Sequence, residues 1–262
     1  MQIDSKMIDG VAKFFRILGH LDFSGPMKSR TCRDNLAHYL TLGCPKLDAS
    51  LAVTSPSLPE GANLARLILG DDFLSQELVG EKMGWQYSDE QLGNLPASVD
   101  LNMLMWLRQY NYFLTPTHPT KALNLLDVRA LDPSLFCSKK DGWYADERQK
   151  FAREEALQLG SWLAIRKDVT QNSILKKWEE QQKFLTREEH VPMACELAYG
   201  IVTYSKVRGV RLYERLYSRT SSVSADGGRV YLGGFDAGGL RVDYCWDGDR
   251  DDGLGIASSR KM

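Results

Sequence analysis

The residues best suited to chemistry lie near the C-terminus, in the stretch CWDGDRDDGLG from Cys245 to Gly255. Four of these residues are aspartates, at positions 247, 249, 251 and 252. The first three alternate in the way that the first ligands of an EF-hand calcium loop alternate. That loop also needs a glycine at its sixth position and a glutamate at its twelfth, where this chain has Asp252 and Ser258. The EF-hand motif therefore fails, and we predict no metal site here.

Other motifs of catalytic chemistry are missing from the sequence, which has no G-x-S-x-G, H-E-x-x-H or P-loop pattern. The histidines stand in unlike contexts, which favours surface or core roles over metal binding: His20, His38, His118 and His190. The cysteines are widely spaced without a C-x-x-C pair, which indicates reduced thiols: Cys32, Cys44, Cys137, Cys195 and Cys245. We expect no enzymatic activity and no cofactor.

Composition excludes further classes of protein. The 262 residues can form one large domain or two modest ones, and 43% hydrophobic residues suffice for a sizeable core. A net charge of −1 gives no general attraction to nucleic acid or to an anionic membrane. The N-terminal segment lacks the apolar core of a signal peptide, and no apolar run reaches membrane-spanning length. These features predict a soluble, cytoplasmic protein without nucleic-acid partners or membrane insertion.

Helices dominate the expected structure of residues 1–135. An apolar stripe from Met7 to Leu18 predicts one helix, and a second is expected at 35–42. Residues 44–63 contain three prolines and predict a loop or linker. Further helix starts are expected at Ser88, which has capping-box spacing, at Ser98, and in the stretch TKALNLLDVRAL.

Strands and helices follow an ordered pattern in residues 136–262. The stretch 161–167 predicts a strand, Ser173 a helix cap, and Pro192 the first turn of a second helix that ends at Gly209. Four strand candidates follow: VRLYERLYSR, RVYLGGF, LRVDYCW and LGIASSRK. The first and last strands of this region are expected to pair. We predict an α+β fold whose C-terminal domain has the layout of the C-type lectin fold: strand, two helices, antiparallel strands.

The amino-acid composition of the last part of the chain is unusual. Between Val230 and Ile256 there is no Lys, Glu, Gln or Met, although all four are common earlier in the chain. The stretch instead contains Asp, Gly, Tyr, Cys and Arg among Val, Leu, Phe and one Trp. Changes at the two adenines of an AAC or AAT codon reach Asp, Gly, Tyr, Cys, Arg, Leu, Phe and Val, but never Lys, Glu, Gln, Met or Trp. A glycine-rich loop region with solvated aspartates would explain the same composition.

The chain from Leu131 to Met262 resembles the variable proteins of diversity-generating retroelements. The resemblance is carried by GWYADERQKFAREEA, WLAIRKD, NSILKKWEEQQKFL and RLYERLYSR, and above all by residues 229–261. In that family a reverse transcriptase copies a template with errors at adenines, and the copy replaces the end of the variable gene. The resemblance implies a C-type lectin-like fold that displays a diversified ligand-binding surface. The implied ligand is an unknown macromolecule or cell-surface molecule.

The resemblance also implies two classes of residue. Framework positions are Val230, Phe235, Leu240, Trp246, Asp247, Arg250 and Gly255. Diversified, solvent-facing positions that bind ligand are Tyr231, Gly234, Arg241, Asp243, Tyr244, Cys245, Gly248, Asp249, Asp251, Asp252 and Gly253. In LRVDYCW, alternation turns Tyr244 and Trp246 to the same face as Leu240, so we expect Trp246 in the core. For Tyr244 the two arguments disagree, because the resemblance implies that it faces solvent whereas alternation places it on the inner face.

Two alternatives stay open. A calcium-dependent lectin would use Asp247 with nearby carboxylates, although the usual Glu-Pro-Asn and Gln-Pro-Asp tripeptides are absent. An enzyme of the formylglycine-generating type would need closely placed cysteines or bound copper, for which Cys195 and Cys245 are the candidates.

Overall fold

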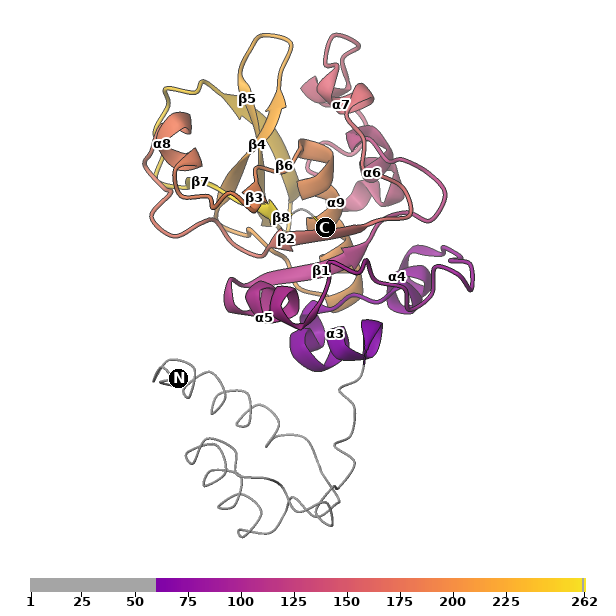
Figure 1. Ribbon diagram of the computed structural model, residues 1–262. Helices are drawn as coiled ribbons and strands as arrows, with labels where there is room; N and C mark the ends of the chain where they lie inside the picture. Colours follow the sequence, from indigo (N-terminus) through magenta and orange to yellow (C-terminus); the bar gives the residue numbers. More distant parts are fainter. Residues whose placement is uncertain (1–59, 261) are drawn as a thin grey trace, which may run out of the picture. The chain divides into compact units, whose positions relative to one another are not determined.

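The computed structural model describes residues 60–260 and 262, and the chain separates into two compact units, Met1–Ser57 and Leu58–Met262. All described residues belong to the second unit (Figure 1). The two N-terminal helices and most of the loop expected at 44–63 lie outside the described residues, as do Cys32 and Cys44. Within the described residues, no helix has the length and apolar character needed to cross a membrane.

The described unit combines helices with two four-stranded sheets, which confirms the α+β class (Figure 1). The α-helices are α3 (Gly61–Leu69), α4 (Gln76–Met83), α5 (Leu101–Gln109), α6 (Leu125–Leu131), α7 (Phe151–Glu154), α8 (Trp178–Gln182) and α9 (Ala194–Arg208). Short 3-10 turns are η3 (Gly70–Asp72), η4 (Pro133–Leu135) and η5 (Trp143–Ala145).

The first sheet is antiparallel, with strand order β1-β2-β8-β3. Its strands are β1 (Tyr112–Pro116), β2 (Trp162–Arg166), β8 (Ser259–Arg260) and β3 (Glu189–His190). Ala164 lies opposite Arg260, so the expected pairing of the first and last strands of the C-terminal region is confirmed. Strand β1 comes from the region expected to be mostly helical, and it joins the same sheet by pairing with β2.

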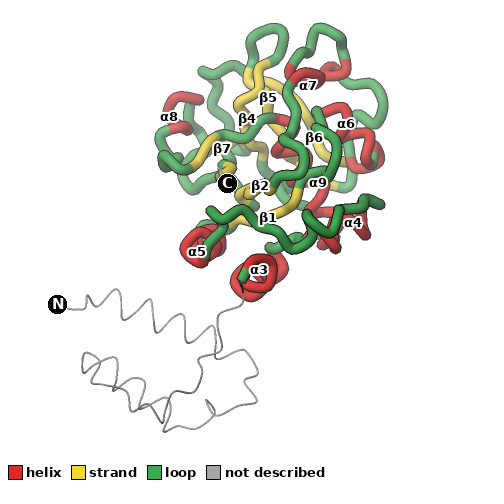
Figure 2. Tube along the Cα trace, turned by 45° about the vertical axis from the view of Figure 1, so that its right-hand side comes forward, coloured by secondary structure: helices red, strands yellow, loops and turns green. Residues whose placement is uncertain are grey.

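Both faces of the first sheet are covered. Alternation along β1 sends Phe113 into the hydrophobic cluster that contains much of α9, and sends Tyr112 and Leu114 into a second cluster with residues of α3 and α5. Figure 2 shows α3 and α5 beside β1. The residues of the four strands of the first sheet are consequently buried or half-buried.

The second sheet has the order β6-β5-β4-β7. Its strands are β4 (Tyr217–Val223), β5 (Arg229–Asp236), β6 (Gly239–Cys245) and β7 (Leu254–Ile256). Strands β4, β5 and β6 are antiparallel neighbours, whereas β7 runs parallel to β4. The inner face of this sheet contributes Val230, Leu232, Leu240 and Val242 to the main core.

Helix α9 contacts strands of both sheets. Met193 occupies the N-cap position of α9, and its N–H donates to Glu196 Oε2 at 2.7 Å. Gly209, with φ 69°, ends the helix in the left-handed conformation expected of a glycine at this position. The predicted helix is confirmed, although Pro192 precedes its first turn. Gly200 permits close packing, because a Cβ there would lie 3.1 Å from the Phe113 ring.

Several expected element boundaries are wrong. Ser173 does not cap a helix: α8 begins at Trp178, and the Ser173 hydroxyl accepts the Ile256 N–H at 3.1 Å. The Ser88–Gln91 pair closes a turn instead of a helix, and Asp100 caps α5 in place of Ser98. The Ser173 hydroxyl has thus found a backbone amide that is distant in sequence, which local spacing does not reveal.

Candidate functional site

Predicted variable positions gather on the outer face of β5 and β6. The register places Tyr231 opposite Asp243 and Gly233 opposite Arg241. Alternation turns these side chains away from the core face, which carries Leu232 and Val242. Arg241 and Asp243 are exposed, and Tyr231 is half-buried. We call Tyr231, Arg241, Asp243 and the loop Trp246–Gly253 the candidate surface.

Aspartates of the loop accept hydrogen bonds from its own backbone. Asp249 Oδ2 accepts the Trp246 N–H at 2.9 Å, and Asp251 Oδ1 accepts the Gly253 N–H at 2.7 Å. The second of these bonds, from the amide two residues on, is typical of an Asx turn. Gly248, Asp249, Asp251 and Asp252 are all exposed. Among residues 60–260 and 262, no group of three or more His, Cys, Asp or Glu side chains is placed to hold a metal ion.

Two expected framework residues join the loop to the segment around α8. Arg229 donates to both carboxylate oxygens of Asp247 at 3.1 Å, and its guanidinium lies 4.1 Å from the centre of the Trp178 ring. Arg250 forms an ion pair with Glu180 at 3.2 Å. A bidentate pair restrains geometry more than a single contact does. Asp247 and Arg250 are therefore exposed residues that tie the loop down.

Trp246 is 56% exposed, so its expected place in the core is wrong. Strand β6 ends at Cys245, and the period-two argument stops one residue before Trp246. The chain then turns, because the Asp249 N–H donates to the Trp246 carbonyl at 3.0 Å. A different tryptophan, Trp143, packs against β6: its ring lies 4.9 Å from the Tyr244 ring and its Nε1–H donates to the Val242 carbonyl.

Gly234 is buried, so the expectation that it faces solvent is also wrong. Its φ is +54°, and a Cβ added there would lie 2.3 Å from the Tyr217 hydroxyl. Both the backbone conformation and the space demand a glycine. Tyr217 covers this position and meets the Tyr231 ring edge-on, with ring centres 5.5 Å apart. The remaining framework expectations of Val230, Phe235, Leu240 and Gly255 match buried positions.

Three other predicted positions are half-buried: Tyr244, Cys245 and Gly253. Tyr244 lies opposite Val230 on the inner face. The alternation of the strand therefore predicted its position correctly, and the expected solvent exposure did not. The Cys245 Sγ lies 3.3 Å from the Nε of Arg219. Burial raises the pKa of the Cys245 thiol, while Arg219 works in the other direction. Burial and the Asp243 charge raise the pKa of Tyr231. Both groups are therefore neutral at pH 7.

Residues outside the C-terminal segment complete this region, and the sequence reasoning missed them. They are Trp143, Tyr217 and Arg219. Arg219 is fully buried, which is rare for an arginine. Its only signal in the sequence is a charged residue among the small and polar residues of YSRTSSV.

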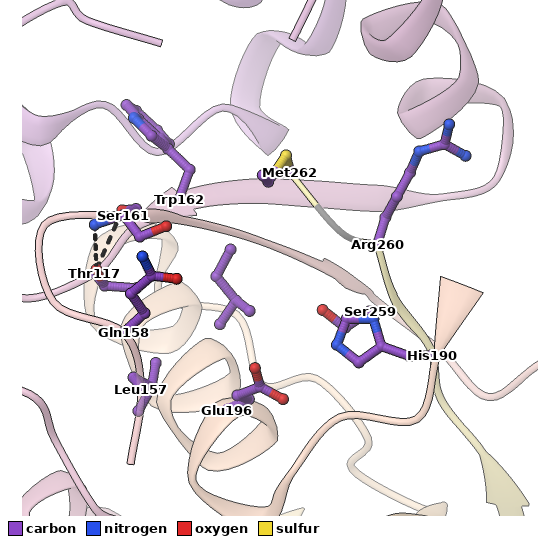
Figure 3. Close-up of a pocket in the computed structure, with 11 residues that line it drawn as sticks. Thr117, Leu157, Gln158, Ser161, Trp162, His190, Glu196, Ser259, Arg260 and Met262 are labelled. Atoms are coloured by element: carbon purple, nitrogen blue, oxygen red, sulfur yellow. Dashed lines mark hydrogen bonds between the residues drawn. The ribbon is translucent and has the colours of Figure 1, made fainter. Parts of the chain in front are cut away.

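A second candidate is a cavity of about 290 Å³ at the edge of the first sheet, into which Glu196 projects from α9 (Figure 3). Burial, and to a smaller degree the Glu155 charge, raise the pKa of Glu196. Much of the polar lining is occupied by local bonds: Thr117 exchanges hydrogen bonds with the Ser161 backbone, and the Ser259 hydroxyl donates to the Ala164 carbonyl. The cavity contains no predicted site residue.

The described cysteines differ in their surroundings. Cys195 is fully buried in α9, and burial raises the pKa of its thiol well above the ordinary value. Cys137 is exposed. A nucleophilic cysteine needs a lowered pKa and access to substrate, so neither Cys195 nor Cys245 has the surroundings of an activated thiol.

Comparison with known proteins adds no relative: no family model, no curated protein and no solved structure matches the chain.

Proposed function

We propose that this domain binds a macromolecular or cell-surface ligand through the candidate surface, and that a retroelement diversifies that surface. One observation carries the proposal. Six of the eleven positions expected to vary, 241, 243, 248, 249, 251 and 252, are exposed, and four of the seven framework positions, 230, 235, 240 and 255, are buried. The buried Gly234 and the exposed Trp246, Asp247 and Arg250 depart from this division. Exposed positions accept substitution at little cost to stability, as a diversified surface requires.

The arrangement of elements supports a C-type lectin-like scaffold for this surface. Strands β2 and β8 pair near the ends of the C-terminal region, helices α8 and α9 lie between them in sequence, and β4, β5 and β6 form an antiparallel sheet. In such a layout the terminal strands and α9 hold the core. The later strands and their loops are then free to present side chains.

The chemistry of this version of the surface favours a ligand with cationic groups. Asp243, Asp249, Asp251 and Asp252 are exposed, and Arg241 and Arg250 each pair with another acid of this domain. Trp246 and Tyr231 add aromatic rings next to these carboxylates. Aromatic side chains supply much of the energy in adaptable binding surfaces, and Trp also attracts cations through its ring.

The DNA next to the gene tests the diversification. We expect a reverse transcriptase gene and a template repeat that matches codons 229–261 except at adenines. The template should have AAC or AAT at codons 241, 243, 249, 251 and 252, and a tryptophan codon at 246. A template that differs at other bases, or no template in any genome that carries the gene, would contradict the proposal.

Binding is tested with ligands captured on the purified chain from cell-envelope extracts. The variant Arg241→Ser, Asp243→Asn, Asp249→Asn, Asp251→Ser and Asp252→Ser should lose at least tenfold in affinity for a captured ligand. A matched control changes exposed charges elsewhere: Asp89→Asn, Glu90→Gln, Lys139→Ser and Asp141→Asn. The control should bind like the parent. Equal binding by a folded surface variant would place the site elsewhere.

A further inference from the structure

Arg219 of β4 lies beneath the loop of the candidate surface, with its whole side chain buried. Its guanidinium donates to four acceptors in two stretches of the chain, 176–181 and 245–249. The acceptors are the Lys176 carbonyl at 3.1 Å, Gln181 Oε1 at 2.9 Å, the Asp249 carbonyl at 2.8 Å and Cys245 Sγ at 3.3 Å. None of its acceptors among the described residues is a carboxylate. A buried guanidinium must have its donors satisfied, because removing a charge from water is costly.

The bond to the loop does not depend on the side chain at position 249. Arg219 reaches the Asp249 carbonyl, and every residue type supplies a carbonyl. The Asp249 carboxylate meanwhile turns to the Trp246 N–H on the exposed side. Arg219, which we call the clamp, thus contacts the main chain of a position whose side chain is expected to vary.

Three further hydrogen bonds, which we call tethers together with that of Arg219, also hold the loop by its main-chain carbonyls. The Trp178 N–H donates to the Asp247 carbonyl at 2.9 Å, the Leu175 N–H to the Asp251 carbonyl at 3.2 Å, and the Tyr217 N–H to the Gly253 carbonyl at 2.8 Å. Together with Arg219 they hold the carbonyls of four alternate residues, 247, 249, 251 and 253. These donors all lie outside the loop, and residues 247–252 remain exposed.

The backbone of Leu175 shows that this tether is maintained at a cost. Leu175 has φ 60°, a left-handed conformation that is uncommon for residues other than glycine. Its side chain is 53% exposed, so packing does not hold it in place. The bond from its N–H to the loop is a contact that favours this conformation.

We propose that Arg219 is a positioning residue that holds the loop Asp247–Gly253 in one backbone conformation whatever side chains it carries. This inference rests on the proposed function, because it explains how a diversified loop keeps its shape. A guanidinium suits the task since it donates in several directions from a rigid plane, which a lysine cannot do. Cys245 is a position expected to vary whose side chain Arg219 contacts through a hydrogen bond, and Tyr231, also expected to vary, lies opposite Arg219 on the neighbouring strand.

The test uses amide hydrogen exchange, measured by NMR on the chain without ligand. The amides of Leu175, Trp178 and Tyr217 report directly on whether the loop is tethered, because they donate to its carbonyls. Arg219→Lys should accelerate exchange of the Leu175 and Trp178 amides by about tenfold or more, since hydrogen bonds of a charged group are lost. The side-chain variant Asp249→Ser, Asp251→Ser and Asp252→Ser should leave these rates within about threefold of the parent.

A general loss of stability would accelerate exchange everywhere, so Leu232→Ala in β5 serves as the control. It removes buried volume on the inner face and touches no tether. In Arg219→Lys the rise at Leu175 and Trp178 should exceed the rise at Ile201 in α9, whereas in Leu232→Ala it should not. If Arg219→Lys does not fold, Gln181→Ala removes one acceptor of the clamp and should give the same order with a smaller ratio.

Two results would overturn the proposal: unchanged exchange at Leu175 and Trp178 in a folded Arg219→Lys or Gln181→Ala variant, or acceleration of these amides by the side-chain variant equal to that caused by Arg219→Lys. Because no ligand is present, these outcomes concern only how the loop is held. Loss or retention of binding is decided by the separate surface variant, so the two proposals can fail independently.

Discussion

The two sheets differ in the number of faces they bury. The first sheet lies between two hydrophobic clusters, so residues on both of its faces are constrained by packing. The second sheet buries the face that carries Leu240 and Val242, while Arg241 and Asp243 of the same strand are exposed. A strand with one open face can change every second residue without disturbing the core. The difference teaches where this fold can accept variation.

The largest expected effect breaks the buried face of the second sheet. Leu240→Ala should lower the free energy of unfolding by about 2–5 kcal/mol, because it leaves a cavity among fully buried side chains. Its neighbour Arg241→Ser should change it by about 0.5 kcal/mol or less. Denaturant unfolding measures both. Similar costs for the two variants would mean that the faces of β6 are not as different as their exposure indicates.

Two glycines expected to vary, the buried Gly234 of β5 and the exposed Gly248 of the loop, sharpen the comparison. Gly234→Ser should destabilise by about 1–3 kcal/mol, because its Cβ would clash with Tyr217 and its φ is positive. Gly248→Ser should cost about 0.5 kcal/mol or less, since no atom lies within 4 Å of the added Cβ. Thermal melting separates them. A tolerated Gly234→Ser would return this position to the diversified set.

Glu196 tests the helix that serves both sheets. Burial, and less strongly the Glu155 charge, raise the pKa of Glu196 above its ordinary value of 4.5. The folded state therefore binds this proton more tightly than the unfolded chain, and the contribution to stability falls as pH rises above about 4.5. Glu196→Gln keeps an acceptor for the Met193 N–H and lacks the charge.

Melting curves at several pH values show the effect. Glu196→Gln should match the parent near pH 4 and melt at a higher temperature at pH 7, by about 2–4 °C for each kcal/mol gained. Glu147→Gln, at an exposed position, is the control for the substitution itself. Equal melting of Glu196→Gln and parent at both pH values would contradict the burial of this carboxyl in the folded state.

Trp246 should give the smallest effect on stability. Trp246→Ala should change the free energy of unfolding by about 0.5 kcal/mol or less, because the ring is exposed. Trp143→Ala should cost about 1 kcal/mol or more, since it removes the contact with Tyr244 and a hydrogen bond to Val242. Chemical denaturation of both variants would show the reverse order if Trp246 were in the core.

The sequence predicted those parts of the fold whose signals are local. Helix α9 combines an apolar run with a terminal glycine, and the alternation in LRVDYCW assigned Leu240, Arg241 and Asp243 to their correct faces. The prediction that Trp246 lies in the core was wrong because alternation continues only as far as the strand does, and the end of β6 is set by bonds within the following turn. The prediction that Gly234 faces solvent was wrong because the residue that covers it, Tyr217, lies on another strand. Arg219 gave little signal, since a charged residue normally predicts exposure.

The tethers at alternate carbonyls constrain the length of the loop as well as its shape. If the proposed role of Arg219 holds, substitutions between Asp247 and Gly253 leave every tether in place. A single inserted residue would carry one of the carbonyls past its donor and would reverse the facing of those that follow. Strand β7 next to β4, and β8 between β2 and β3, come directly after the loop and would have to absorb the shift. Under the proposed function, we expect diversity to arise by exchange of residues at constant number. An added codon that kept the reading frame would still produce a damaged protein.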